Sequence, residues 1–199
     1  MTNSEVEQKA QDVLAQYLPK RGNAHKILPA IMEEEQIKFR EIISSNQKFV
    51  GALTKANSGQ WYIILNTIEN TGRRNFTIAH ELGHSFLEHQ LQSNSFYCSD
   101  DAITEESQSA NPIEQEANQF ASCLLMPEEK LRNAFLAMLA NSRKARVKDF
   151  LEVKNDYTFS IWRGICADLM KRYGVSEAGL RYRLQRLGVA SFHFKNSPK

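Results

Sequence analysis

The run His80-Glu-Leu-Gly-His84 constrains this chain more than any other part of its sequence. On a helix, residues four apart share a face, so both imidazoles can bind one metal ion while Glu81 points at the water that the metal binds. The apolar residues around the run recur at helical spacing; they are Phe76, Ala79, Leu82, Gly83, Phe86 and Leu87. Both histidines are therefore expected at the buried edge of a helix. If they were ordinary core-edge residues, the buried carboxylate between them would be costly without a cation.

Gly83 lies inside this predicted helix, where glycine costs ~1 kcal/mol relative to alanine. Close packing of another element would explain it, and so would a need to keep the metal pocket open. The sequence does not decide between these two explanations.

A catalytic zinc site needs a third protein ligand. His89 lies nine residues after His80, whereas the extended zinc motif with a third histidine places it ten after, so we interpret His89 as a surface residue at the helix end. Residues 111–127 hold the better candidate, because Pro112 suits a first helical turn and an apolar stripe follows it. Glu114 falls at the edge of that stripe, whereas Glu116 points away from it and is expected in solvent.

Asn118 follows Glu114 by four residues and lies on roughly the same side of the predicted helix. Its side chain could accept a hydrogen bond from the outer nitrogen of a ligand imidazole. The predicted metal ligands are His80, His84 and Glu114. Zinc suits this set best, although two histidines and one glutamate can also hold manganese, iron or cobalt.

Three runs carry a resemblance to a known family: Arg74-Asn-Phe-Thr-Ile-Ala-His-Glu-Leu-Gly-His84, Pro112-Ile-Glu-Gln-Glu-Ala-Asn-Gln-Phe-Ala121 and Leu124-Leu-Met-Pro127. They resemble the ImmA/IrrE family of bacterial and phage zinc peptidases, specifically over about 70–127 and more weakly over 24–70 and 160–190. The resemblance implies a gluzincin-like site in which a glutamate on a second helix, here Glu114, completes the two histidines. It also implies a substrate class, because better-understood members act on helix-turn-helix repressors in mobile elements or stress responses.

The chemistry of such a site also follows from the residues. Zinc lowers the pKa of bound water from 15.7 towards ~7, and Glu81 can take the proton and pass it to the leaving amine. An additional group usually stabilises the oxyanion. The candidates are Tyr97, Arg73, Arg74, Tyr157 and His193, and the sequence does not choose among them.

The expected fold is α+β: a small antiparallel three-stranded sheet packed on a helical, zincin-like core, with a C-terminal helix-turn-helix-like hairpin. Two helices are predicted first, over about 6–17 and 24–35. Three β-rich runs follow at 37–43, 49–54 and 61–65, and their short polar connections suggest an antiparallel meander against the metal helix. The polar stretch 93–110 reads as a surface loop or a lid.

The C-terminal region is strongly basic. Residues 1–139 hold 12 basic and 18 acidic side chains, whereas residues 140–199 hold 13 and 5. This region also predicts a helix over 162–173, a turn at Gly174 and a second helix capped by Ser176. Arg181, Arg183 and Arg186 are expected to project from that second helix, where they could contact DNA. A hairpin that merely closes the core is the alternative, which we favour.

Length and composition limit the expected domain organisation and cellular location. A metallopeptidase-like domain over 1–140 and a basic helical region over 141–199, packed on the same domain, fit the 199 residues. Neither an apolar stretch of 18 residues nor a signal-like N-terminus is present, so we expect no membrane partner and a cytoplasmic protein. The odd number of three cysteines favours reduced thiols.

Two functional classes fit these observations. One is a zinc endopeptidase that cleaves a regulatory protein, with a helix-turn-helix repressor as the expected substrate. The other is a DNA-binding or protein-binding transcriptional regulator that keeps a zinc site without turnover. Glu81 favours the peptidase, because a structural zinc site has no need of a general base and closes its fourth position with a protein ligand.

Overall fold

The computed structural model describes residues 1–18, 22–46, 48–67, 70–89, 95–99, 111–142 and 149–193. The helices are α1 (Asn3–Tyr17), the short 3-10 helix η1 (Ala24–Lys26), α2 (Leu28–Glu34), α3 (Thr71–Phe86), α4 (Pro112–Leu125), α5 (Glu128–Asn141), α6 (Asp156–Tyr173) and α7 (Glu177–Arg186). The strands are β1 (Lys38–Ile42), β2 (Phe49–Lys55), β3 (Trp61–Asn66), β4 (Ser95–Ser99), β5 (Leu151–Val153) and β6 (Ala190–Phe192). The fold is mixed α+β, as the sequence predicted.

The main sheet differs from the predicted antiparallel meander. Among the described residues it has four strands in the order β1-β3-β2-β4, and β1 runs parallel to β3. Strand β2 is antiparallel to both β3 and β4. The fourth strand comes from the stretch that was predicted to be a loop, and residues 93, 94 and 100–110 of that stretch lie outside the described part. Strands β3 and β4 occupy the two sides of β2, and β1 pairs with the other side of β3 at an edge of the sheet, where most of its side chains are exposed.

Helix α3 packs closely against the main sheet. A side chain on Gly51 of β2 would place its Cβ 2.6 Å from Thr77 Cγ2 and 2.9 Å from Leu65 Cδ2. Such distances are below van der Waals contact, so only glycine allows the strand to approach the helix this closely. Thr77 is completely buried beneath this strand.

Helix α4 packs on another side of α3, and this contact explains Gly83. A Cβ at Gly83 would lie 3.2 Å from both the Cα and the backbone oxygen of Ala117 in α4. The small residue therefore permits close packing of the two helices, which was one of the two explanations that the sequence left open. The stacked rings of Phe86 and Phe120 extend the same interface, with centroids 5.7 Å apart.

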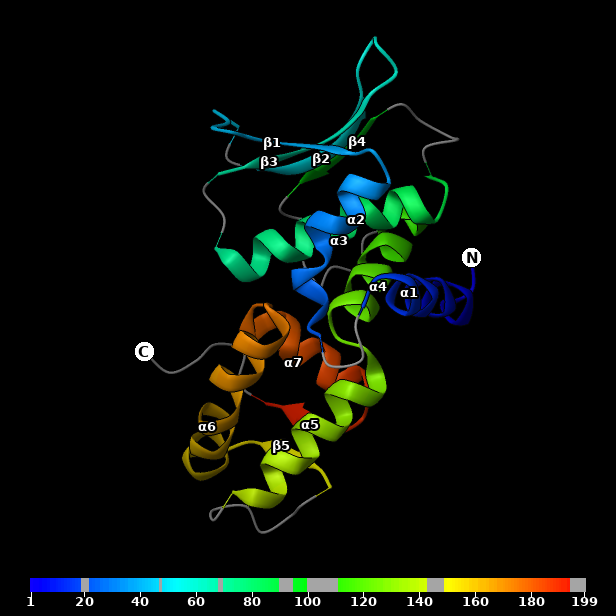
Figure 1. Cartoon of the computed structure of the whole chain (residues 1–199). Helices are drawn as coiled ribbons and strands as arrows, with labels where there is room; N and C mark the ends of the chain where they lie inside the picture. Colours follow the sequence, from blue (N-terminus) through cyan, green and yellow to red (C-terminus); the bar gives the residue numbers. More distant parts are fainter. Residues whose placement is uncertain are drawn as a thin grey trace.

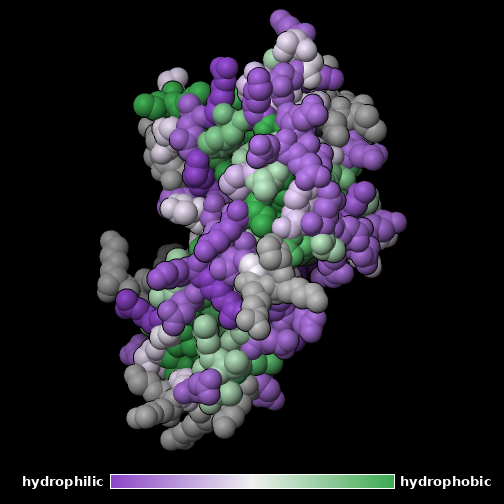
Figure 2. Space-filling model, viewed as in Figure 1, coloured by the Kyte–Doolittle hydropathy of each residue, from purple (hydrophilic) through white to green (hydrophobic). Residues whose placement is uncertain are grey.

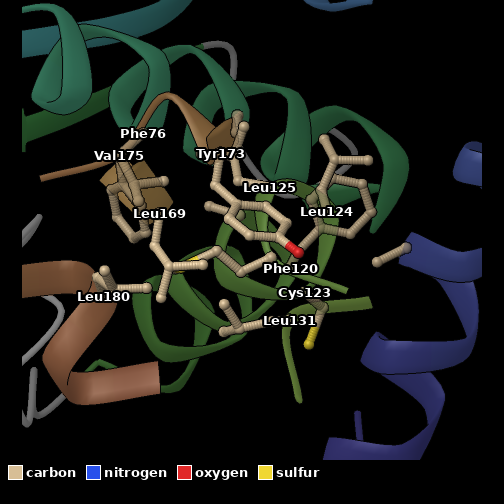
Figure 3. Packing of buried hydrophobic residues seen from close by; sticks show 14 of the residues in the cluster. Phe76, Phe120, Cys123, Leu124, Leu125, Leu131, Leu169, Tyr173, Val175 and Leu180 are labelled. Carbon is tan, nitrogen blue, oxygen red and sulfur yellow. The ribbon is translucent and has the colours of Figure 1, made fainter. Parts of the chain in front are cut away.

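The first turn of α3 contacts the turn between α6 and α7. A Cβ at Gly72 would lie 2.5 Å from the backbone carbon of Val175, and Asn75 Nδ2 donates a hydrogen bond to the Gly174 oxygen at 2.8 Å. Figure 3 shows the apolar side chains that gather beside this contact, among them Phe76, Phe120, Leu169, Tyr173 and Val175. Helices α3, α4 and α6 therefore contribute to one hydrophobic core.

Helices α3 and α4 occupy the middle of the molecule, with the main sheet at one end and α5, α6 and α7 at the other (Figure 1). Strands β5 and β6 pair in parallel beside these last helices. Helix α6 ends at Gly174, whose φ of 65° is left-handed, and Ser176 caps α7 by accepting a hydrogen bond from the Gly179 amide. The helix-turn-helix prediction placed both features correctly along the chain, whereas the domain boundary at 140 stays a prediction.

The visible surface in Figure 2 is mainly hydrophilic, with hydrophobic residues confined to small patches. Within the described residues, none of the helices combines the length and the apolar character that crossing a bilayer would require.

Replacing Gly72 with alanine should destabilise the fold, because the new methyl group meets the backbone of Val175, which cannot move aside without shifting the α6–α7 turn. Overpacking of this kind costs about 1–3 kcal/mol. Gly164→Ala in α6 is the matched control: nothing lies within 4 Å of its Cβ position, so helix propensity should stabilise the protein by about 0.5–1 kcal/mol. Urea unfolding of the three proteins measures both effects. An unchanged midpoint for Gly72→Ala would contradict this packing.

Candidate metal centre

Two histidines of α3 face each other inside the protein. The Asn70 side chain caps the helix by accepting a hydrogen bond from the Arg73 amide, and every residue from Asn75 to His84 is buried. His80 and His84 are one turn apart, with ring centroids at 4.8 Å and Nε2 atoms at 3.1 Å. Both side chains are fully buried.

Glu114 of α4 completes the cluster. Pro112 occupies the first turn of α4 and the Asn111 side chain accepts from the Ile113 amide, so the helix begins two residues before Glu114. Its Oε2 lies 3.1 Å from His80 Nε2, and its Oε1 lies 3.5 Å from His84 Nε2. One ligand atom from each of the three side chains falls within 4.8 Å of the others. The structure thus brings together the three ligands that the sequence predicted.

The donor set fits a divalent metal ion. His80 Nδ1 lies 2.8 Å from Asn118 Oδ1, which can only accept, so Nδ1 carries the ring proton and Nε2 presents its lone pair to the centre. Two imidazole nitrogens and one carboxylate are a typical catalytic zinc set that leaves a fourth position for water. The residues present therefore fit zinc, and His80, His84 and Glu114 would be its protein ligands.

The pKa values of the metal-free cluster differ among its members. Burial holds the pKa of His84 at about 4, although its hydrogen bond with Glu114 opposes this effect. For His80, burial disfavours the charged form, but the hydrogen bond with Glu114 and the charge of Glu81 outweigh it and raise the pKa. Hydrogen bonds from both histidines keep the pKa of Glu114 far below its usual value despite burial. A proton held on His80 must leave when a metal binds, so acid competes with the metal.

Glu81 follows His80 on α3 and is also fully buried. Its negative charge is one of the contributions that raise the pKa of His80, so the carboxylate lies within electrostatic reach of the metal centre. A buried carboxylate beside three metal ligands is costly unless a cation compensates it. Its place matches that of a general base in a His-Glu-x-x-His site.

The structure contradicts the prediction that His89 is a surface residue. Its side chain is only 3% exposed, and its Nδ1 lies 3.0 Å from His84 Nδ1. Helix α3 ends at Phe86 and Glu88 has a left-handed φ of 61°, so the chain turns back and places His89 over the last helical turn. Spacing along an ideal helix could not reveal this contact, because it depends on the reversal after the helix end.

Glu116 is less solvated than predicted. Its Oε2 lies 3.0 Å from His89 Nε2, and its other oxygen contacts the amino group of Met1, leaving the side chain 19% exposed. The helix wheel of α4 correctly separates Glu116 from the core face. It could not show that His89 approaches from another segment.

The arginines predicted to contact DNA do not form one exposed basic face. Arg183 is 6% exposed, donates a hydrogen bond from Nε to the Met126 oxygen at 3.2 Å, and lies 3.7 Å from Glu7. The prediction that it projects into solvent is therefore wrong. The end of α4 presents a carbonyl that needs a donor, and the long arginine side chain reaches it from the edge of the α7 apolar stripe.

The other two arginines of α7 lie on aromatic rings. The Arg181 guanidinium is 4.8 Å from the ring centre of Phe192 and is partly buried, whereas exposed Arg186 lies 5.8 Å from the ring centre of Tyr182. Of the three arginines, Arg186 alone is exposed to solvent.

The candidates for oxyanion stabilisation lie in different surroundings. Arg74 is paired with Glu41 at 2.6 Å, and His193 is paired with Glu152 at 3.2 Å. Tyr157 is exposed on α6, and Arg73 is partly buried in the first turn of α3. The side chain of Tyr97 lies outside the described part of the chain.

Glu114→Gln should weaken zinc binding by at least tenfold, because an amide removes the only negative charge among the three predicted ligands. Glu129→Gln is the matched control, since Glu129 is exposed in the first turn of α5. Zinc content after dialysis and competition with a fluorescent chelator measure the change. Equal affinity in both variants would exclude Glu114 as a ligand.

No protein of curated function matches the sequence. A solved structure, a Mycobacterium tuberculosis transcriptional regulator, superposes with a TM-score of 0.57 at 14% identity, covering 92% of this chain and 46% of that one. The likeness concerns the fold alone, and this chain spans less than half of that protein's length. The sequence also matches the profile of the IrrE N-terminal-like domain over residues 32–185, which is more than half of the chain. The chain therefore belongs to the Peptidase_M78 family, whose domain is the IrrE N-terminal-like domain.

Proposed function

We propose that this protein is a zinc-dependent endopeptidase that hydrolyses a peptide bond in a regulatory protein. The observation that carries the proposal is the buried convergence of His80, His84 and Glu114 beside Glu81. These are the three ligands and the carboxylate that peptide hydrolysis at a zinc ion requires. Membership of a peptidase family supports the same assignment.

Zinc held by the three ligands would supply a Lewis acid and would lower the pKa of water towards ~7. The carboxylate of Glu81 acts as the general base that takes a proton from the attacking water. The same carboxyl group then donates that proton to the amine that leaves when the peptide bond breaks. Asn118 keeps His80 in the tautomer that presents Nε2 to the centre.

A helix-turn-helix transcriptional repressor is the proposed substrate, which would give the enzyme a role as an anti-repressor or in a stress response. The family resemblance supports this class of substrate. The similar structure is that of a transcriptional regulator, but its identity of 14% limits that support to the fold.

The alternative is a transcriptional regulator that binds DNA through α7 and keeps zinc without turnover. It has less support, because Arg183 is engaged with Met126 inside the protein and Arg181 lies against Phe192. A structural zinc site also has no use for a general base such as Glu81.

Glu81→Gln should abolish peptidase activity while zinc remains bound, because the amide keeps the shape of the side chain but cannot take a proton. Loss of a general base lowers the rate by about 10²–10⁴-fold. Zinc-loaded wild type and Glu81→Gln are each added to a host cell extract, and mass spectrometry maps new protein termini. Termini produced by the wild type alone, within a helix-turn-helix protein, are the expected result.

The exposed Glu129→Gln variant is the control, and it should produce the same termini as the wild type. A chelator should remove these termini and added zinc should restore them. Identical maps for the wild type and Glu81→Gln, with one zinc bound to each, would contradict the peptidase.

A further inference from the structure

A line of three hydrogen-bonded side chains connects α4 to the second ligand histidine. Glu116 Oε2 lies 3.0 Å from His89 Nε2, and His89 Nδ1 lies 3.0 Å from His84 Nδ1. The Nε2 atom of His84 faces Glu114 and the metal centre. The line therefore reaches the centre through the ring of His84.

The direction of the protons along this line is fixed by the ligand role of His84. An imidazole that offers Nε2 to a metal carries its proton on Nδ1, so His84 donates to His89 Nδ1. His89 Nδ1 then has no proton, and the proton of that ring is on Nε2, where it is donated to Glu116. All three groups are satisfied by this arrangement and by no other in which His84 Nε2 binds the metal.

Several features of the chain hold His89 in this place. The His89 side chain is almost completely buried, although the residue follows the end of α3. Glu88 has a left-handed backbone conformation, which turns the chain so that His89 points inwards. That conformation is unfavourable for a residue other than glycine. The rings of His84 and His89 meet edge to face, with centroids 5.1 Å apart.

We propose that His89 and Glu116 are positioning residues that fix the tautomer and the ring orientation of the metal ligand His84. Neither touches the metal or the substrate; Glu116 acts through His89, and His89 acts through His84. The inference rests on the metal site of the proposed function. It adds to that site the carboxylate of Glu116, acting through His89, which the ligand motif itself does not contain.

The two ligand histidines are supported in different ways. His80 donates to the neutral amide oxygen of Asn118, whereas His84 donates to a histidine that is backed by a carboxylate. Partners of this kind raise the basicity of the ligand ring, and their loss usually weakens metal affinity by about 10–100-fold. The support of His84 should therefore contribute measurably to zinc affinity.

Two substitutions of His89 separate its two hydrogen bonds. In His89→Asn the side-chain oxygen can occupy the Nδ1 position and accept from His84, but the link to Glu116 is lost. In His89→Gln the amide nitrogen can occupy the Nε2 position and donate to Glu116, but the acceptor for His84 is lost. His193→Asn is the control for zinc affinity, because His193 is exposed and pairs with Glu152, which is not one of the three predicted ligands.

The dissociation constant of zinc, measured by chelator competition, is the main readout. We expect His89→Gln to weaken zinc binding by about 10–100-fold, His89→Asn by clearly less, and His193→Asn not at all. The visible spectrum of the Co²⁺ form should change in His89→Gln, because the His84 ring loses its orientation. Unfolding of the metal-free variants shows whether a general loss of stability is responsible.

Glu116→Gln tests the outer link in two backgrounds. In the otherwise wild-type protein it should weaken zinc binding, whereas in His89→Asn it should add nothing, because the link is already absent. Glu116 also contacts the Met1 amino group; an effect that acted through this contact would persist in the double variant.

Equal zinc affinity in His89→Asn, His89→Gln and the wild type would overturn the inference, and so would an effect of Glu116→Gln that is undiminished in the His89→Asn background. The inference would also be overturned if the loss of zinc affinity in each variant simply paralleled the fall in its unfolding midpoint. A wild-type protein that binds no zinc would instead overturn the metal site and the proposed function together.

Discussion

The close contact between α3 and α4 is the interaction on which the rest of this molecule depends. Gly83 lets the two helices approach so closely that a Cβ at this residue would lie 3.2 Å from the backbone of Ala117. That approach carries Glu114 to within hydrogen-bonding distance of His80. A side chain at this position would press on the α4 backbone beside Ala117 and would shift the helix that carries Glu114 relative to the helix that carries the two imidazoles.

The same contact brings a cost in electrostatic free energy. It buries the carboxylates of Glu81 and Glu114 beside two imidazoles, although removing an ion from water costs several kcal/mol in a real protein. A divalent cation compensates two buried carboxylates better than a single proton on one imidazole could. The main sheet, α4 and the α6–α7 turn each contact α3, with a glycine at each close approach, so the helix that carries His80 and His84 is held from several sides. The basic C-terminal helices contribute to the same core, and Arg183 donates a hydrogen bond to the Met126 carbonyl at the end of α4.

The sequence predicted the parts of this arrangement that depend on local spacing. Helix α3, its two histidines and the position of Glu114 in the first turn of α4 all follow from helical periodicity and capping residues. Features set by the tertiary fold were missed. The order of the strands depends on β4, which arises in a polar stretch without a strand pattern. The burial of His89 depends on the reversed chain at Glu88, and the burial of Arg183 depends on a carbonyl of another helix.

The most direct test of this account is a crystal structure of the zinc-loaded protein, with anomalous scattering recorded at the zinc absorption edge. The account predicts one strong peak at about 2.0–2.2 Å from His80 Nε2, His84 Nε2 and a Glu114 oxygen, with water in the remaining position. A fourth protein ligand that closes the site would indicate structural zinc and contradict the peptidase. A peak at any other place in the molecule would contradict the metal centre itself.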